Sequence, residues 1–173
     1  TTWSMFGQVW PSSLVLADAV QAYDLVGKRI LEIGCGLAIP SMVACRRGAN
    51  VTAIDQHPLA AEFLRENLVL NALPALPFRR GNWSAPDAAL GKFDLIIASD
   101  VLYDRQQPKT LAAFIDDHAA DSVEILVIDP NRGHQAKFAG HMKTFGYAYK
   151  ETRVACNWSS GETYKGRMLT YSR

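Results

Sequence analysis

Four residues near the start of the chain have the types and spacing of a nucleotide-cofactor site. An apolar run at residues 30–33 leads into two glycines, Gly34 and Gly36, and Glu32 lies just before the first of them. Gly34 allows a sharp turn, and Gly36 has no Cβ to keep a ligand away from the backbone. Asp55 ends the next apolar run, about 20 residues later, where a carboxylate can accept both hydroxyls of a ribose. The pattern predicts a strand, a tight turn and a helix that together bind a cofactor containing a ribose.

Two classes of cofactor use such a turn, and Glu32 distinguishes between them. A dinucleotide site needs a third glycine at the position that Ile39 occupies, so its fingerprint is incomplete. A carboxylate would repel a diphosphate but attract S-adenosylmethionine, which carries an ammonium and a sulfonium group. Asp55 suits both classes. The sequence therefore favours S-adenosylmethionine over a nicotinamide dinucleotide, while a structural alternative is that Glu32 only pairs with a nearby arginine.

Asp100 and Tyr103 follow an almost fully apolar stretch, residues 93–98, and could orient an amine. Transfer of a methyl group from a sulfonium is a displacement, so the nucleophile must lie in line with the methyl group. A carboxylate can hold an arriving ammonium, desolvation can lower the pKa of that ammonium, and an aromatic ring favours the cationic group. We expect Asp100 and Tyr103 to position the target amine. The alternative is a helix cap by Asp100 and a packed Tyr103.

Other polar and aromatic residues extend the predicted site. Trp83 could stack on an adenine ring and Asn82 could bond its exocyclic amine, while Trp10 could cover the cofactor. Packing in the core is an equal alternative for both tryptophans. Arg132 and His134 could meet the substrate, but surface arginines and histidines are common, so we give them little weight.

The elements that position these residues alternate between strand and helix. We expect an α/β fold: a doubly wound, Rossmann-like, seven-stranded sheet, mostly parallel with a C-terminal antiparallel hairpin and with helices on both faces. Apart from Trp10, the candidate residues fall at the carboxyl ends of strands, where such sheets bind ligands. A serine, Ser12 or Ser13, is expected to cap the first helix. The predicted strands are residues 30–33, 50–54, 78–80, 93–98, 123–128, 147–156 and 167–171, and the predicted helices are residues 14–23, 41–47, 58–70, 108–118 and 136–145.

Composition excludes several classes of protein. A chain of 173 residues with 49% hydrophobic residues is expected to form one domain over residues 1–173. A net charge of +1 gives no electrostatic reason to expect binding to nucleic acid or to an anionic membrane. The apolar runs are too short to span a bilayer, and we expect no signal peptide before the domain. Three separate cysteines predict a reducing cytoplasm, and the four scattered histidines predict no metal site.

With these motifs together, the chain resembles a seven-β-strand S-adenosylmethionine-dependent methyltransferase. More narrowly, it resembles the family 16 methyltransferases, which include many protein lysine methyltransferases. The Asp-x-x-Tyr segment, the early Trp-Pro and the Asn-Trp pair are the specific features, and the glycine turn is less so. The resemblance runs from about residue 7 to at least residue 146, over segments 9–12, 31–36, 51–55, 66–67 with Asn71, 81–83, 93–96, 99–103, and 129–130 with Arg132.

The resemblance implies a set of roles for individual residues. Asp100 and Tyr103 match the Asp-x-x-Tyr motif that the family uses to position the target amine. The chain departs from the family at Ala38, where the usual motif has a third glycine, and in its short N-terminus. The residues implied to contact the cofactor are Trp10, Glu32, Gly34, Gly36, Asp55, Asn82, Trp83 and Ala98.

The leading hypothesis from the sequence is an enzyme that transfers a methyl group from S-adenosylmethionine to a lysine nitrogen of a protein, leaving S-adenosylhomocysteine. A small-molecule N-methyltransferase is the alternative, because fold and cofactor motif do not decide the substrate. A non-catalytic cofactor-binding module and a nicotinamide-dependent oxidoreductase are more distant alternatives.

Overall fold

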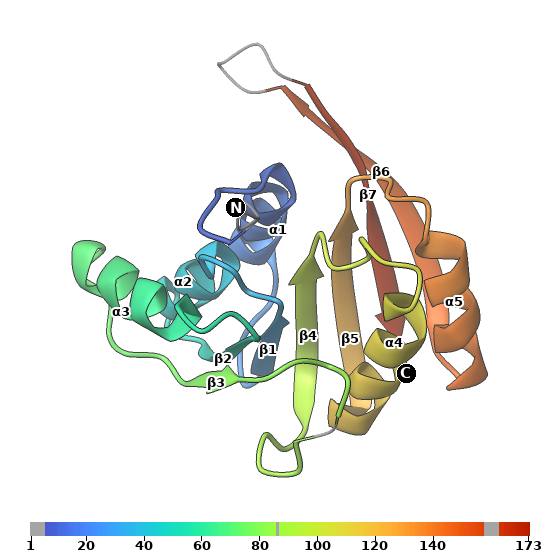
Figure 1. The fold of residues 1–173 in the computed structure, drawn as a ribbon, viewed down its shortest axis with the longest axis horizontal. Coiled ribbons are helices and arrows are strands. Elements are labelled where there is room, and N and C mark those ends of the chain that lie inside the picture. Colours follow the sequence, from blue (N-terminus) through green and yellow to red (C-terminus); the bar gives the residue numbers. More distant parts are fainter. Residues whose placement is uncertain (1–5, 86, 158–162) are drawn as a thin grey trace.

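A computed structural model describes residues 6–85, 87–157 and 163–173. Within them the chain forms one seven-stranded sheet with helices on both faces (Figure 1). The predicted loop residues 158–161 lie outside the described part. The strands are β1 (Arg29–Ile33), β2 (Asn50–Asp55), β3 (Phe78–Arg80), β4 (Phe93–Ser99), β5 (Ala119–Asp129), β6 (Ala148–Asn157) and β7 (Thr163–Ser172). The helices are α1 (Pro11–Ala22), α2 (Ile39–Arg46), α3 (Ala60–Leu70), α4 (Gln107–His118) and α5 (Gln135–Thr144).

The order of strands across the sheet is β3-β2-β1-β4-β5-β7-β6. The first five strands pair in parallel, and β7 lies antiparallel between β5 and β6. The chain leaves β1 towards β2 on one side, whereas β4 lies on the other side of β1. Ligands bind such sheets at the carboxyl ends of the strands where the order reverses. The predicted doubly wound fold with its terminal hairpin is confirmed.

Alternation of side chains along the strands separates two layers of core. Ile30, Leu95 and Ile97 pack with α1 and α2 on one face, and α3 packs on Ala53 of the same face. Leu31 and Ile96, with their neighbours, pack with α4 and α5 on the opposite face. Because both faces are covered, the central strands are largely apolar, with Glu32 of β1 and Asp94 of β4 as exceptions.

The first helix begins earlier than predicted, and the serine cap is wrong. Helix α1 starts at Pro11, after Trp10, whose side chain makes no cap hydrogen bond. Proline fits the first turn of a helix because no partner is needed for its missing N–H. Ser13 Oγ donates back to the Trp10 carbonyl oxygen at 2.8 Å, and Ser12 Oγ lies 3.0 Å from the Tyr164 hydroxyl. Both serines therefore have other partners.

Two strands are longer than their apolar patterns indicated. β5 begins at Ala119, which pairs with Phe93 ahead of a shift in register. β7 begins at Thr163, because its first residues, 163–166, pair with β6 although they extend beyond the end of β5. The remaining boundaries lie within one or two residues of the predicted ones.

The C-terminal hairpin extends beyond the carboxyl edge of the parallel strands. Arg167 of β7 pairs with Asp129, the last residue of β5, so residues 163–166 project past the sheet (Figure 1). Tyr164 in this projecting part reaches α1 through its contact with Ser12. The hairpin is thereby attached to the layer of helices that carries Trp10. No helix in the described part of the chain has the length and apolarity needed to cross a membrane.

Candidate active site

A cavity of about 260 Å³ lies at the carboxyl ends of β1, β2 and β4. Of the ten residues predicted for the site, three do not line this cavity: Glu32, Asn82 and Ala98. Residues from six separate segments of the sequence meet there, and all but the segment before α1 follow strands of the parallel sheet. The seven predicted residues that line the cavity are Trp10, Gly34, Gly36, Asp55, Trp83, Asp100 and Tyr103.

The turn after β1 has two glycines for two different reasons. Both have left-handed backbones, with φ of +63° at Gly34 and +52° at Gly36. A Cβ at Gly34 would lie 3.0 Å from Val101 Cγ1 and 3.4 Å from the Trp83 ring, whereas a Cβ at Gly36 would meet nothing within 4 Å. Gly34 therefore lets the β4 loop and Trp83 approach, and Gly36 leaves open space on the cavity side.

Asp55 braces this turn from the end of β2. Its Oδ2 accepts the Gly36 N–H at 2.8 Å, and its Oδ1 accepts the His57 N–H at 2.8 Å. The Cys35 N–H donates to the Ile54 carbonyl oxygen at 3.1 Å, which joins the turn to β2 a second time. A carboxylate has about four lone-pair sites, so Asp55 retains acceptor capacity towards the cavity.

Glu32 lies behind the turn, on the side of α2, and is 1% exposed. Its Oε2 accepts the Ser41 N–H at 2.9 Å and also the Ser41 hydroxyl. Burial raises the pKa of Glu32 to about 8, although the two hydrogen bonds from Ser41 oppose the rise. Burial therefore favours the protonated form of Glu32, and its structural partner is a serine rather than the arginine considered from the sequence.

Ala38 has the backbone of the glycine it replaces. It has φ 56° and ψ 36°, directly before α2, and its side chain is fully buried. Its N–H donates to the Cys35 carbonyl oxygen at 2.7 Å, which closes the turn. Left-handed backbone is costly for alanine, so the substitution keeps the turn at the expense of local strain.

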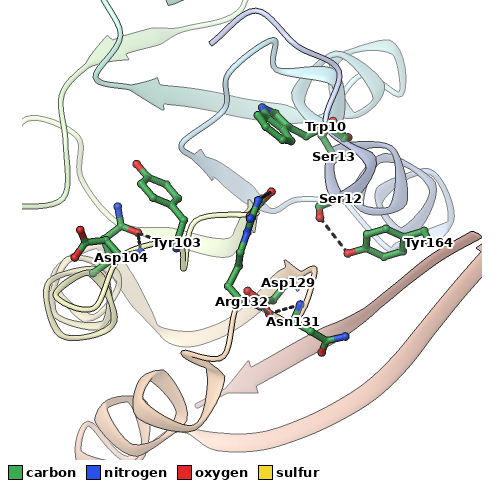
Figure 2. A network of polar contacts seen from close by, with 11 residues as sticks. Trp10, Ser12, Ser13, Tyr103, Asp104, Asp129, Asn131, Arg132 and Tyr164 are labelled. Carbon is green, nitrogen blue, oxygen red and sulfur yellow. Dashed lines mark hydrogen bonds and ion pairs between the residues drawn. The ribbon is translucent and has the colours of Figure 1, made fainter. Parts of the chain in front are cut away.

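Asp100 is held by its backbone and by both carboxylate oxygens. It has φ 54°, and its N–H donates to the Ile128 carbonyl oxygen at 2.9 Å. Arg132 Nε donates to Oδ1 at 2.9 Å and Arg132 Nη2 donates to Oδ2 at 2.8 Å. Figure 2 shows the Arg132 side chain extending from the loop after β5 between Tyr103 and Trp10. The predicted amine-orienting carboxylate is therefore half of an ion pair.

The loop after β5 is built to present Arg132. Asp129 is 1% exposed, and its Oδ2 accepts the backbone N–H groups of Asn131 at 2.8 Å and Arg132 at 3.1 Å. Gln135 donates to the same oxygen from the start of α5. Burial raises the pKa of Asp129, and the backbone hydrogen bonds oppose the rise. Asn131 Oδ1 accepts a hydrogen bond from Arg167 Nε at 2.8 Å, which joins the loop to β7.

Asn82 and Ala98 have local structural roles in this arrangement. Asn82 Oδ1 accepts the Ser84 N–H at 2.9 Å, a bond that shapes the turn after β3. Ala98 is fully buried in the sheet, and the next residue, Ser99, reaches the cavity instead. Trp83 lines the cavity and also packs against the core, and its stacking on an adenine ring stays a prediction.

Sequence reasoning undervalued Arg132 and missed one wall of the cavity. The sequence could have indicated Arg132, because this residue follows Asp129 at the carboxyl end of a predicted strand, where the other candidate residues also lie. The wall is the segment before α1, where Phe6 stacks on His57 with ring centroids 3.9 Å apart and an interplanar angle of 8°. No periodicity in the sequence indicates that contact. Among the described residues, no group of three or more His, Cys, Asp or Glu side chains could hold a metal ion.

The sheet order, the glycine turn braced by Asp55 and the cavity over β1 and β4 define a Rossmann-like α/β protein of the kind that binds nucleotide cofactors. A family model described as lysine methyltransferase matches residues 1–145, and the chain belongs to that family. The resemblance inferred from the motifs is confirmed.

Similar proteins of known name are methyltransferases. Human histone-arginine methyltransferase METTL23 is 35% identical over 114 residues, which cover 62% of this chain and 60% of that protein. The rat electron transfer flavoprotein beta subunit lysine methyltransferase is 30% identical over 80% of this chain and 53% of its own length. The chain thus spans 60% or less of these relatives.

Solved structures support the fold. Magnesium protoporphyrin IX methyltransferase from Synechocystis, solved with bound S-adenosylmethionine, has a TM-score of 0.73 at 20% identity, over 96% of this chain and 86% of that one. Precorrin-6y C5,15-methyltransferase from Geobacter metallireducens has a TM-score of 0.75 at 15% identity, over 97% of this chain and 93% of that one. At these identities the likeness concerns the fold.

Proposed function

We propose that this protein is an S-adenosylmethionine-dependent methyltransferase that methylates the side-chain nitrogen of a protein lysine. The observation that carries the proposal is a single cavity in which a braced glycine turn lies beside the Asp100 and Tyr103 pair. Membership of the lysine methyltransferase family supports the reaction class. Relatives named as protein-lysine methyltransferases, including METTL21A of Xenopus tropicalis, support the substrate class.

The residues present fit the cofactor. The open space at Gly36 leaves room for a ligand against the backbone, and Asp55 has lone pairs available for ribose hydroxyls. Trp83 and Trp10 offer aromatic faces within the same cavity. When bound, S-adenosylmethionine supplies an electrophilic methyl group on a sulfonium.

We propose that Glu32 interacts electrostatically with the bound cofactor from behind the glycine turn. A cation close to a buried carboxyl lowers its pKa, and the pKa of Glu32 is about 8 without one. Binding of S-adenosylmethionine at pH 7 should therefore release a proton. Calorimetry in two buffers of different ionisation enthalpy measures that release, and Glu32→Gln should abolish it.

At the acceptor end, the chain holds and orients an amine. Asp100 accepts a hydrogen bond from the amine, and the exposed ring of Tyr103 stands at the cavity wall where an aliphatic side chain would enter. The amine attacks only as the free base, so its proton must leave to solvent first. Positioning of the nitrogen in line with the methyl group accounts for the acceleration.

The test is to incubate the protein with labelled S-adenosylmethionine and a heat-inactivated cell extract. Methyl-lysine in the hydrolysed protein fraction supports the proposal, and Asp100→Asn should reduce it. Label that appears only in small molecules would favour the small-molecule alternative. Calorimetry with S-adenosylmethionine and with a nicotinamide dinucleotide separates the methyltransferase from an oxidoreductase, and binding without turnover would indicate a non-catalytic module.

We infer that residues 1–173 act as one domain, supported by a single sheet with cores on both faces. A reducing cytoplasmic location is supported by the three cysteines, none of which forms a disulfide. A protein rather than a nucleic-acid substrate is supported by a net charge of +1.

A further inference from the structure

Arg132 occupies the carboxylate of Asp100 with a two-point ion pair. The two N–H···O contacts are 2.9 Å and 2.8 Å long, and both residues line the cavity. The Asp100 side chain is 11% exposed and the Arg132 side chain 40% exposed. A guanidinium that binds both oxygens of a carboxylate is the strongest and most directional pairing between these groups. The acceptor end of the cavity therefore already contains a bound guanidinium, supplied by the chain itself.

We infer that Arg132 is a positioning and selectivity residue that excludes guanidinium acceptors and suits the site to the free base of a primary amine. The inference rests on the proposed function and deepens it. It predicts methyl-lysine as the product of this chain, whereas the human relative METTL23 is named as a histone-arginine methyltransferase.

The selectivity follows from the geometry of the lone pairs. A carboxylate has about four lone-pair sites, and the fork of Arg132 takes one on each oxygen. A single N–H of an amine can use either remaining site. A substrate guanidinium needs two parallel acceptors for its own fork, and those are the sites that Arg132 fills. An arginine acceptor would have to displace Arg132, whereas a lysine acceptor can bind beside it.

The charge balance favours the reactive form of the amine. Arg132 cancels the negative charge of Asp100, so a bound ammonium gains little from that carboxylate. The hydrogen bond to Asp100 raises the pKa of Arg132, so the guanidinium keeps its positive charge. The other titratable groups are few: Asp55, His57 and Tyr103 line the cavity, and Asp129 and Tyr164 act on Arg132 from β5 and β7.

Both partners are fixed before any substrate arrives. Asp129 accepts the backbone N–H of Arg132, and Asn131 is tied to Arg167 of β7. Asp100 is held in a left-handed backbone by its bond to the Ile128 carbonyl oxygen. Left-handed backbone at a non-glycine residue persists where the surroundings enforce it, which is common at functional sites.

The test compares Arg132→Gln, Arg132→Lys and a control, Arg173→Gln. Arg173 forms a single-contact ion pair with Asp116, at 2.7 Å and 34% exposure, and pairs with Val123 at the amino end of β5, away from the cavity. Each protein is first titrated with S-adenosylmethionine by calorimetry. Methyl transfer to a heat-inactivated extract is then measured from pH 6 to 10, and hydrolysates are separated into methyl-lysine and methyl-arginine.

We expect only methyl-lysine from the unmodified protein and from the Arg173 variant. Arg132→Gln leaves Asp100 uncompensated, which stabilises the ammonium, so the pH of half-maximal rate should rise by about one unit. The same variant should begin to form methyl-arginine. Arg132→Lys retains the charge but not the fork, so its pH profile should stay near that of the unmodified protein while its selectivity relaxes.

Two results would overturn the inference and leave the methyltransferase function standing. One is methyl-arginine formed by the unmodified protein. The other is an Arg132→Gln protein that binds cofactor and makes methyl-lysine alone with an unshifted pH profile. An unmodified protein that does not bind S-adenosylmethionine would instead refute the proposed function, and the inference with it.

Discussion

The two glycines of the turn after β1 have equal backbone costs and unequal surroundings, so they form a matched pair for substitution. An alanine in the left-handed region costs about 1–2 kcal/mol, and the stiffer unfolded chain returns about 0.4–1 kcal/mol. At Gly36, with φ +52° and nothing within 4 Å of a Cβ, the free energy of unfolding should therefore fall by about 1 kcal/mol on substitution by alanine.

Gly34→Ala should cost more, because its Cβ would meet packed atoms. Val101 Cγ1 would be 3.0 Å away and the Trp83 ring 3.4 Å away. Overpacking of this kind adds about 1–3 kcal/mol, for a total of about 2–4 kcal/mol. Since 1 kcal/mol corresponds to about 2–4 °C at this chain length, the melting temperature should fall by about 2–4 °C in Gly36→Ala and by about 4–16 °C in Gly34→Ala.

The affinity for the cofactor should be lowered in Gly36→Ala even though this variant is the more stable of the two. Gly36 lines the cavity and a Cβ there would meet no protein atom within 4 Å, so we expect Gly36→Ala to weaken S-adenosylmethionine binding at least about tenfold, equivalent to about 1.4 kcal/mol, in a protein of nearly normal stability. Scanning calorimetry measures the first effect and titration calorimetry the second. Equal melting temperatures for the two variants would refute the packing argument. Unchanged affinity in Gly36→Ala would show that the ligand does not approach this side of the turn.

Three further predictions concern strain, protonation and the hairpin. Ala38→Gly should change the free energy of unfolding by less than about 1 kcal/mol, because relief of the left-handed strain offsets the loss of a buried methyl group. Ala44→Gly, equally buried but inside α2, should lower it by about 2 kcal/mol. Urea unfolding measures both changes. Because the pKa of Glu32 is raised from 4.5 to about 8 in the folded protein, its contribution to stability is full below pH 4.5 and is lost as the pH rises to about 8. Denaturation at a series of pH values should show that loss, and Glu32→Gln should remove it. Gly166→Ala should lower the free energy of unfolding by about 1–3 kcal/mol, because its Cβ would clash with the ring of Tyr164. Gly140→Ala, on the open side of α5, should be neutral or stabilising when both variants are compared by scanning calorimetry.

The alternation of elements, and the convergence of the candidate residues on one cavity, could be predicted from the sequence. Apolar stretches such as residues 93–98 predicted strands buried on both faces, and the amphipathic segments between them predicted helices. Once the strands are parallel, the residues that follow them must share one edge. For this reason Gly34, Asp55, Asp100 and Tyr103 could be predicted to meet, and they line one cavity.

The partners of the polar groups could not be predicted in the same way. Glu32 is bonded to Ser41, Asp100 to Arg132, and Phe6 lies against the ring of His57. These contacts depend on the depth at which each helix or loop packs on the sheet. The periodicity of apolar residues indicates which face of a helix or strand is buried, but not which side chains of a neighbouring element come within contact distance.

The sequence by itself determined the class of fold, the edge of the sheet that bears the site and the residue types available there. Tertiary structure alone decided that Glu32 lies behind the turn and that Asp100 is paired. The physical reason is that burial patterns are set by local periodicity, whereas a hydrogen bond needs two atoms within about 3 Å. That distance is settled only when segments far apart in the chain, such as β4 and the loop after β5, have packed together.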